Sequence, residues 1–463
     1  MTQNRGPAAR WLGGVAILVA LVAAPHAAAE APEWKVGLAR VKITPERPVF
    51  LEGYADRTKP FDKVVADLYA KALVLEDRQG RRAVIVTSDL IGFPAAVAEP
   101  ICARIRKKTG LKREAILLTV SHCHTAPRLG LEVKPREHMT VADAQRTVDY
   151  TRQLQDKVVD VVIRAMSHLE PARLSWEAGV VPFVMNRREF TPQGVILGAN
   201  PRGLADRTGP VLRVDTAGAK PRAVLFGAAV HNTTLTGRCY EVCGDYAGFA
   251  QAYVEAQYPS AEALFMLGCA GDADPWPRGT MALARAHGAT LGKEVCRVLD
   301  GKLRPVRGPL EMAFGYADLP LQKPPPRAEL EKQATRSGEV EPWVAKQMLA
   351  VLDRGDKLPR RYTCPLAVWQ FGSDLTLVGL SGEVVVDYVP LLEHALGPNR
   401  LWIAAYSNDV FGYLPSAKVL REGGYETRGL YAGGIGYFSP KAQGLVVERV
   451  RQLARQAGRP LPR

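Results

Sequence analysis

The stretch Ile116-Leu117-Leu118-Thr119-Val120-Ser121-His122-Cys123-His124 joins a mainly apolar run to a polar cluster that follows it directly. The apolar run predicts a buried strand, and two imidazoles two residues apart in extended chain point to the same face. Four more apolar runs end in polar clusters: His231-Asn232-Thr233, Gly271-Asp272-Ala273-Asp274, Ser381-Gly382-Glu383, and Asn408-Asp409 with Tyr413 after it. Ligands of layered α/β proteins bind beyond the carboxyl ends of strands, so this pattern is typical of an enzyme.

Patterns typical of strands alternate with amphipathic helical patterns along the chain. The expected strands are Ala83–Thr87, Ala115–Val120, Ala223–Val230, Ala263–Leu267, Leu375–Leu380 and Leu401–Tyr406. The expected helices are Pro94–Thr109, Val141–His168, Tyr246–Tyr258, Thr280–Leu299, Val384–Leu396 and Pro440–Gln456. This alternation predicts an α/β fold, a layered mixed sheet with flanking helices. Val180–Phe190 and Leu310–Leu319 predict additional antiparallel strands.

Residues 30–463 are expected to form a single domain, because no linker divides them cleanly. The segment from Pro320 to Pro342 is rich in proline and charge, and we interpret it as a surface excursion that leads to a short helix from Trp343 to Asp353.

The first residues have the features of a secretory signal peptide. Arg5 and Arg10 precede an apolar stretch from Trp11 to Ala24, which is shorter than the roughly 20 residues that span a bilayer. Ala27-x-Ala29 supplies the small residues of a cleavage site. We therefore expect cleavage near Ala29 and an exported protein, periplasmic or secreted, with residues 1–29 outside the fold.

The chain is basic, with a formal net charge of +14 at pH 7. Loss of Arg5 and Arg10 with the signal peptide would leave about +12, which is +14 minus 2. No nucleic-acid motif is present, so the plain interpretation is a solvated basic surface, and the alternative is contact with an anionic membrane surface. The seven Cys are an odd number, and Cys239 and Cys243 are close enough in sequence for a local bridge.

The clusters at the strand ends contain the ligand types of a zinc site. His122, His231 and Glu383 offer two imidazoles and a carboxylate, and Tyr413 adds a phenol. Zinc lowers the pKa of bound water to about 7, so hydroxide becomes available at neutral pH. His124, beside the first ligand, is then the natural proton acceptor.

Each of these residues taken alone has a plainer interpretation. A His at a strand end is more often a hydrogen-bonded structural residue, and Glu383 could interact with the dipole of the expected helix Val384–Leu396. The cluster around Asp274 could be a polar turn, and Asp245 a helix N-cap. Only their joint arrangement favours the metal site.

The chain resembles the neutral ceramidase family, specifically its amino-terminal catalytic domain. The resemblance extends from Val36-Gly37-Leu38-Ala39 to Tyr425-Glu426, and its most specific part, Ser121-His122-Cys123-His124-Thr125-Ala126-Pro127, is similar to the family's Thr-His-Thr-His-Ser-Gly-Pro. It implies that zinc is bound by His122, His231, Glu383 and Tyr413. It also implies that His124 is catalytic and that Arg187 and Tyr425 contact the substrate.

Two departures from the family pattern bear on the substrate. Asp274 stands where the family has a Ser that is essential for ceramide hydrolysis, and we expect no counterpart of the immunoglobulin-like carboxyl-terminal domain that ceramidases have. We expect an exported zinc-dependent hydrolase that cleaves an amide bond in a ceramide-like N-acyl substrate. Asp274, which could orient water, share the metal or bind a cationic substrate, favours an alternative, an amidase or esterase acting on a non-lipid substrate.

A zinc-containing binding protein without turnover is the remaining alternative. The presence of His124 argues against it, since metal binding alone would not require this second imidazole.

Overall fold

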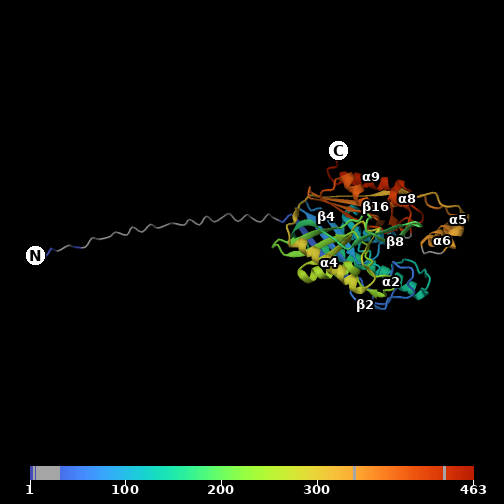
Figure 1. Cartoon of the computed structure of the whole chain (residues 1–463), viewed down its shortest axis with the longest axis horizontal. Coiled ribbons are helices and arrows are strands. Elements are labelled where there is room, and N and C mark those ends of the chain that lie inside the picture. Colours follow the sequence, from blue (N-terminus) through green and yellow to red (C-terminus); the bar gives the residue numbers. More distant parts are fainter. Residues whose placement is uncertain (4–5, 7–31, 337–339, 431–433, 463) are drawn as a thin grey trace. The chain divides into compact units, whose positions relative to one another are not determined.

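The computed structural model describes residues 1–3, 6, 32–336, 340–430 and 434–462 (Figure 1). Met1–Ala31 and Pro32–Arg463 are two compact units. The expected signal peptide falls almost wholly on residues outside the described part. Among the described residues, every helix is too short or too polar to cross a bilayer.

The main sheet has nine strands, eight of them in the order β12-β10-β9-β6-β1-β3-β4-β5, with β14 beside β6. Their bounds are β1 Trp34–Lys42, β3 Tyr69–Asp77, β4 Arg82–Ser88, β5 Ile116–Val120, β6 Glu170–Val180, β9 Thr208–Thr216, β10 Pro221–Ala228, β12 Glu262–Leu267 and β14 Arg304–Val306. The pairs β4–β5 and β10–β12 are parallel, and the other pairs are antiparallel. The prediction of a mixed sheet is therefore confirmed.

Helices cover this sheet, as the sequence predicts. They are α1 Ala95–Thr109, α2 Val141–Met166, α3 Asp245–Gln257 and α4 Met281–Leu299. Helix α2 lies on β1 and β3, while α3 contacts β12 and α4 contacts β6. A capping box between Thr140 and Asp143 fixes the start of α2, and its buried stripe includes Val158 and Val162.

A second sheet has the order β15-β16-β17-β19. Its strands are β15 Leu310–Pro320, β16 Arg361–Phe371, β17 Leu375–Gly379 and β19 Leu401–Ala404. Helix α9, Lys441–Gln456, lies along β15 and β16 (Figure 1). The antiparallel pairing of β15 with β16 confirms the expectation for Leu310–Leu319.

Smaller elements complete the fold. A three-stranded antiparallel sheet joins β13 Ala273–Pro275, β7 Val184–Thr191 and β8 Gly194–Asn200, which confirms the antiparallel expectation for Val180–Phe190. The excursion after Pro320 is more regular than expected, since it contains α5 Arg327–Ala334 packed on α6 Val340–Asp353 (Figure 1). The remaining strands and α-helices are β2 Lys63–Val64, β11 Glu241–Val242, β18 Glu383–Val384, α7 Tyr388–Leu396, β20 Tyr413–Leu414 and α8 Ala417–Glu422, and Arg113–Ala115 and Tyr425–Thr427 form short 3-10 helices.

Residues 405–408, which we call the seam, join the two edges of the main sheet. Strands β12 and β5 stand at opposite ends of the strand order and yet contact one another. The Ala405 N–H donates to the Leu267 carbonyl at the end of β12 (2.9 Å), and the Asn408 N–H donates to the Leu118 carbonyl in β5 (2.7 Å). The sheet is thus curled, and the ends of β5, β12 and β19 meet at one place.

Three local expectations were wrong. The helix expected from Val384 begins at Tyr388, because Glu383 and Val384 form β18 and pair with β20. The β-branched residues after Glu383 suit this strand. The cluster at Asp274 is a turn only at its start, since Ala273–Pro275 is a strand. Asp245 is the first residue of α3 rather than its N-cap, which is Gly244.

The cysteine expectation is also resolved. All seven cysteines are free thiols, so Cys239 and Cys243 carry no bridge.

The close approach of β1 to α2 gives a stability prediction. A Cβ at Gly37 would lie 1.9 Å from the carbonyl oxygen of Ala165, which is a backbone atom that the helix holds in place. Gly37→Ala should therefore lower the free energy of unfolding by about 3 kcal/mol in a urea titration. Gly444→Ala on α9, where a Cβ meets nothing within 4 Å, should instead raise it by roughly 0.5–1 kcal/mol. Equal effects of the two variants would contradict the packing described here.

Candidate metal centre

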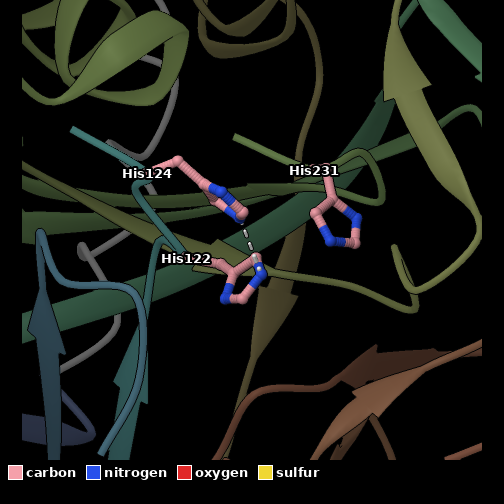
Figure 2. Close-up of side chains that lie close together, drawn as sticks. All are labelled: His122, His124 and His231. Carbon is pink, nitrogen blue, oxygen red and sulfur yellow. Dashed lines mark hydrogen bonds between the residues drawn. The ribbon is translucent and has the colours of Figure 1, made fainter. Parts of the chain in front are cut away.

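Three histidines lie together where the main sheet closes (Figure 2). His122 and His124 follow β5, and His231 follows β10. Their ligand nitrogens all lie within 4.8 Å of one another, and His122 and His231 are 2% and 1% exposed. This buried group could hold a metal ion.

His122 reaches the centre by a different route from the one expected. Strand β5 ends at Val120, and His122 has a φ of 55°, in the left-handed region that non-glycine residues seldom occupy. The two imidazoles therefore meet through a strained turn and not through the alternation of an extended strand. The neighbouring N–H groups of Ser121 and Cys123, which donate to the Ser88 and Leu90 carbonyls, hold this turn.

Backbone carbonyls fix the orientation of two of the rings. His122 Nδ1 lies 2.6 Å from the Ile91 carbonyl, and His231 Nδ1 lies 2.6 Å from the Ala270 carbonyl. A carbonyl only accepts, so each Nδ1 carries the proton and donates it. In the neutral rings, each Nε2 is then a bare acceptor.

Those bare nitrogens face another acceptor. Glu383 Oε2 lies 2.9 Å from His231 Nε2 and 3.1 Å from His122 Nε2. Burial by itself raises the pKa of the Glu383 carboxyl, but the two imidazoles outweigh burial and hold that pKa well below its usual range. Burial and Arg187 lower the pKa of His231, which favours its neutral ring. A metal cation between Glu383 Oε2 and the two Nε2 atoms would satisfy all three ligand atoms at once, where a proton could bridge only one pair.

The distances between these ligand atoms suit a bound metal ion. Ligands 2.0–2.1 Å from a tetrahedral ion are separated from each other by about 3.3 Å. The pairs formed by Glu383 with the two histidines are close to this value. Glu383 is 1% exposed and stands in β18, directly paired with Tyr413 of β20.

His124 is the most accessible of the three histidines. Its Nε2 lies 3.2 Å from His122 Nε2, and its ring packs 4.9 Å from the ring of Tyr54. Its Nδ1 is buried and has no hydrogen-bond partner. Burial and the neighbouring His122 and His231 hold the pKa of His124 well below its usual value, so the ring is neutral and can accept a proton.

Arg187 connects Tyr413 to two buried carboxylates. From β7, its guanidinium donates to the Tyr413 hydroxyl (2.9 Å), to Glu426 (2.9 Å) and to Asp274 (3.3 Å). Burial lowers the pKa of Arg187, but Tyr413, Asp274 and Glu426 outweigh it and raise that pKa well above the usual value. Tyr425 packs against Tyr413, with ring centroids 5.5 Å apart, and is half-buried.

Asp274 is held by two arginines. Its Oδ1 accepts from Arg187 and from the Thr233 hydroxyl (3.1 Å), and its Oδ2 accepts from Arg278 (2.5 Å). Burial raises the pKa of the Asp274 carboxyl, but Arg187 and Arg278 outweigh it and hold the pKa below its usual range. Asp274 is therefore an ionised carboxylate with both oxygens engaged.

Three residues of this centre were not predicted from the sequence. Glu426 is buried and pairs with both Arg187 and Arg188, and Arg278 also donates to the Tyr54 hydroxyl (3.0 Å). Tyr406, in the seam, packs 4.6 Å from the His122 ring, has a φ of 52°, and has a buried hydroxyl without a partner. Tyr406 stands at the end of an apolar run, as the predicted site residues do. This position is the one sequence feature that could have predicted it.

Comparisons with known proteins identify the family of the chain. Residues 34–309 match the model of the family "neutral/alkaline non-lysosomal ceramidase, N-terminal". That range contains His122, His124, Arg187, His231 and Asp274, while Glu383, Tyr413 and Tyr425 follow it. No curated protein sequence matches the chain.

Two solved structures have a similar fold. The neutral ceramidase from Pseudomonas aeruginosa has a TM-score of 0.70 and 21% identity, over 93% of this chain and 76% of that one. A ceramidase complexed with C2 has a TM-score of 0.70 and 20% identity, over the same shares of the two chains. The family match spans more than half of the sequence, and the chain therefore belongs to the neutral/alkaline non-lysosomal ceramidase family.

Proposed function

We propose that this protein is an exported, zinc-dependent hydrolase that cleaves the amide bond of ceramide or a closely related N-acyl lipid. Family membership supports hydrolysis, and the names of the family and of the similar structures support the substrate. The observation that carries the metal is the convergence of His122 Nε2, His231 Nε2 and Glu383 Oε2, while both Nδ1 atoms are already bound to backbone carbonyls.

His122, His231 and Glu383 are the proposed zinc ligands, with Tyr413 as the fourth. Strand pairing supports Tyr413, since it is the direct partner of Glu383 in β18–β20. When bound, zinc supplies Lewis-acid activation of water and of the substrate carbonyl. Arg187, which donates to the Tyr413 hydroxyl, orients the phenol toward this place.

His124 is proposed as general base and then general acid. Its neutral ring can take a proton from the attacking water and return it to the leaving amine. The tilted Tyr54 ring and the adjacent His122 ring, which pack against the imidazole, hold it in position.

Arg187 and Tyr425 are the proposed contacts to the substrate. Arg187 is fixed by Glu426 and Asp274, so its guanidinium is oriented before substrate arrives. Tyr425 stands at the half-exposed side of the centre, with the Arg428 guanidinium 4.5 Å from its ring.

The state of Asp274 bears on the alternative substrate. Two arginines already neutralise its carboxylate, which argues against a role in binding a cationic substrate. We propose instead that Asp274 positions Arg187 in the place where the family uses a Ser. A non-lipid amide or ester remains the second candidate, because Arg278 and Tyr54 add polar groups on that side.

The zinc proposal predicts one ion per chain. Chelator-treated protein should take up one zinc in elemental analysis, and His231→Ala should weaken zinc binding by at least about 100-fold in a competition titration. His168→Ala, at an exposed His, is the control and should bind as the unaltered chain does. His124→Ala should retain the ion. Equal loss in His124→Ala and His231→Ala would instead assign the site to the three histidines.

The substrate proposal predicts chelator-sensitive hydrolysis of a short-chain fluorescent ceramide by the unaltered protein. His231→Ala should lower kcat/KM by at least about 1000-fold. Asp274→Ser leaves Arg187 and Arg278 without their shared carboxylate, so it should cost about 3 kcal/mol of stability and reduce activity. Activity in Asp274→Ser alone would show that the native substrate is not ceramide. Activity on non-lipid amides alone would support the second candidate.

A further inference from the structure

The hairpin formed by β7 and β8 exposes large apolar side chains. Phe190 is 60% exposed, Ile196 48% and Leu197 49%. All three lie within a short two-stranded ribbon whose strands are joined by the turn at Pro192 and Gln193. Exposed apolar groups gathered in this way mark a surface that meets another body.

The apolar side chains occupy both faces of the ribbon. Leu197 of β8 lies opposite Arg188 of β7, and paired residues point to the same face of a ribbon. Phe190 is two residues after Arg188 in β7, so Phe190 and Leu197 share one face. Ile196 lies between these positions and therefore on the other face. A protein partner packed on one face would leave the other in water, whereas a lipid headgroup layer surrounds an inserted ribbon on both.

The hairpin stands at the accessible side of the candidate metal centre. Strand β7 carries Arg187, whose guanidinium reaches the Tyr413 hydroxyl. Strand β8 contacts residues 425–427, and a Cβ on Gly424 would lie 3.0 Å from the Val195 side chain. The ribbon is thus fixed against the loop that holds the half-exposed Tyr425.

The surroundings of the hairpin are basic. Arg202 and Arg207 follow β8 directly and are exposed, as is Arg421 in α8, which contacts residues 425–427. The acidic residues of the same segments are half-buried, as are Glu189, Asp206 and Glu422, or buried, as is Glu426, and Glu422 and Glu426 are paired with Arg188. Together with a net charge of +14 on the chain, this arrangement is complementary to an anionic surface.

We propose that the β7–β8 hairpin inserts into the headgroup layer of an anionic lipid bilayer and holds the Tyr425 side of the centre against it. The inference rests on the proposed function, because it names the source of the substrate, a lipid embedded in a membrane. An amphipathic element with apolar tips and nearby arginines binds such an interface through buried apolar area and charge.

Vesicle binding tests the docking without any hydrolysis. The triple variant Phe190→Thr, Ile196→Thr, Leu197→Thr should co-sediment about 10- to 100-fold more weakly with vesicles of equal parts phosphatidylcholine and phosphatidylglycerol. The control pairs Val180→Thr with Leu445→Gln, two apolar residues that are 58% and 43% exposed elsewhere, and should bind normally. Vesicles of phosphatidylcholine alone should bind the unaltered protein more weakly. Equal binding by the triple variant and the control would overturn the proposal.

Folding and self-association are separated by further measurements. If thermal unfolding shows that the triple variant is unstable, the single variant Ile196→Thr replaces it. Ile196→Thr should bind vesicles less well than the unaltered protein and better than a fully disrupted hairpin. If light scattering finds a dimer that only the triple variant loses, with vesicle binding unchanged, the hairpin serves a second copy of the chain and the membrane proposal is wrong.

Hydrolysis distinguishes this proposal from the proposed function. The triple variant should cleave a short-chain micellar ceramide at the normal rate and a vesicle-embedded one at least about tenfold more slowly. Hairpin-dependent vesicle binding without any hydrolysis by the unaltered protein would leave the docking in place and remove the ceramidase function. Normal hydrolysis of the embedded substrate by the triple variant would support the ceramidase function and contradict docking by the hairpin.

Discussion

The architecture depends on the seam, the four residues that hydrogen-bond to both edges of the main sheet. The N–H of Ala405 bonds to β12 and that of Asn408 bonds to β5. His122 lies two residues after the end of β5, and Ala270, whose carbonyl orients His231, lies three residues after the end of β12. Without the seam, the two edges of the sheet would not hold the ring centroids of His122 and His231 4.8 Å apart. The positive φ of Tyr406 and of Asn408 is the strain that this junction requires.

Behind the histidines, charge is balanced by a buried network. Arg187 and Arg188 share Glu426, and Arg187 with Arg278 holds Asp274. Each buried charge therefore has a partner and several hydrogen bonds, which is the condition under which burial is tolerated. Glu383 is the exception, because no arginine or lysine in the described part of the chain reaches it and its partners are the two imidazoles. A metal ion at this place would supply the positive charge that arginines supply in the rest of the network.

The sequence predicts well what local patterns control. The buried runs at β5, β10 and β12 are apolar on both faces, and helices α2 and α4 carry clear stripes, so their positions followed from periodicity. Strands β1 and β3 were missed. They are antiparallel partners over their full length, and β3 buries Lys71, whose ammonium is paired with Glu255, Glu262 and the Ala263 carbonyl far along the chain.

The candidate centre was predictable to the same extent. His122, His231 and Glu383 stand at strand ends, and that position is visible locally. The helix expected at Val384 was wrong because pairing with Tyr413 decides the local structure, and this pairing is a tertiary contact. Glu426 and Arg278 were missed for the same reason, since nothing near them in the sequence announces Arg187 or Asp274 as a partner.

The seam also sets the order in which this chain can fold. Leu118 and Asn408 are 290 residues apart, and His231 and Glu383 are 152 apart, so the centre is closed by contacts of very long range. Such contacts carry the largest loop-closure entropy and form last. A chain emerging from its amino terminus therefore contains all three histidines before Glu383 and the seam have been added, and it brings the metal ligands together only when the strands around the seam are in place. Metal capture in the final geometry is thus coupled to the end of folding.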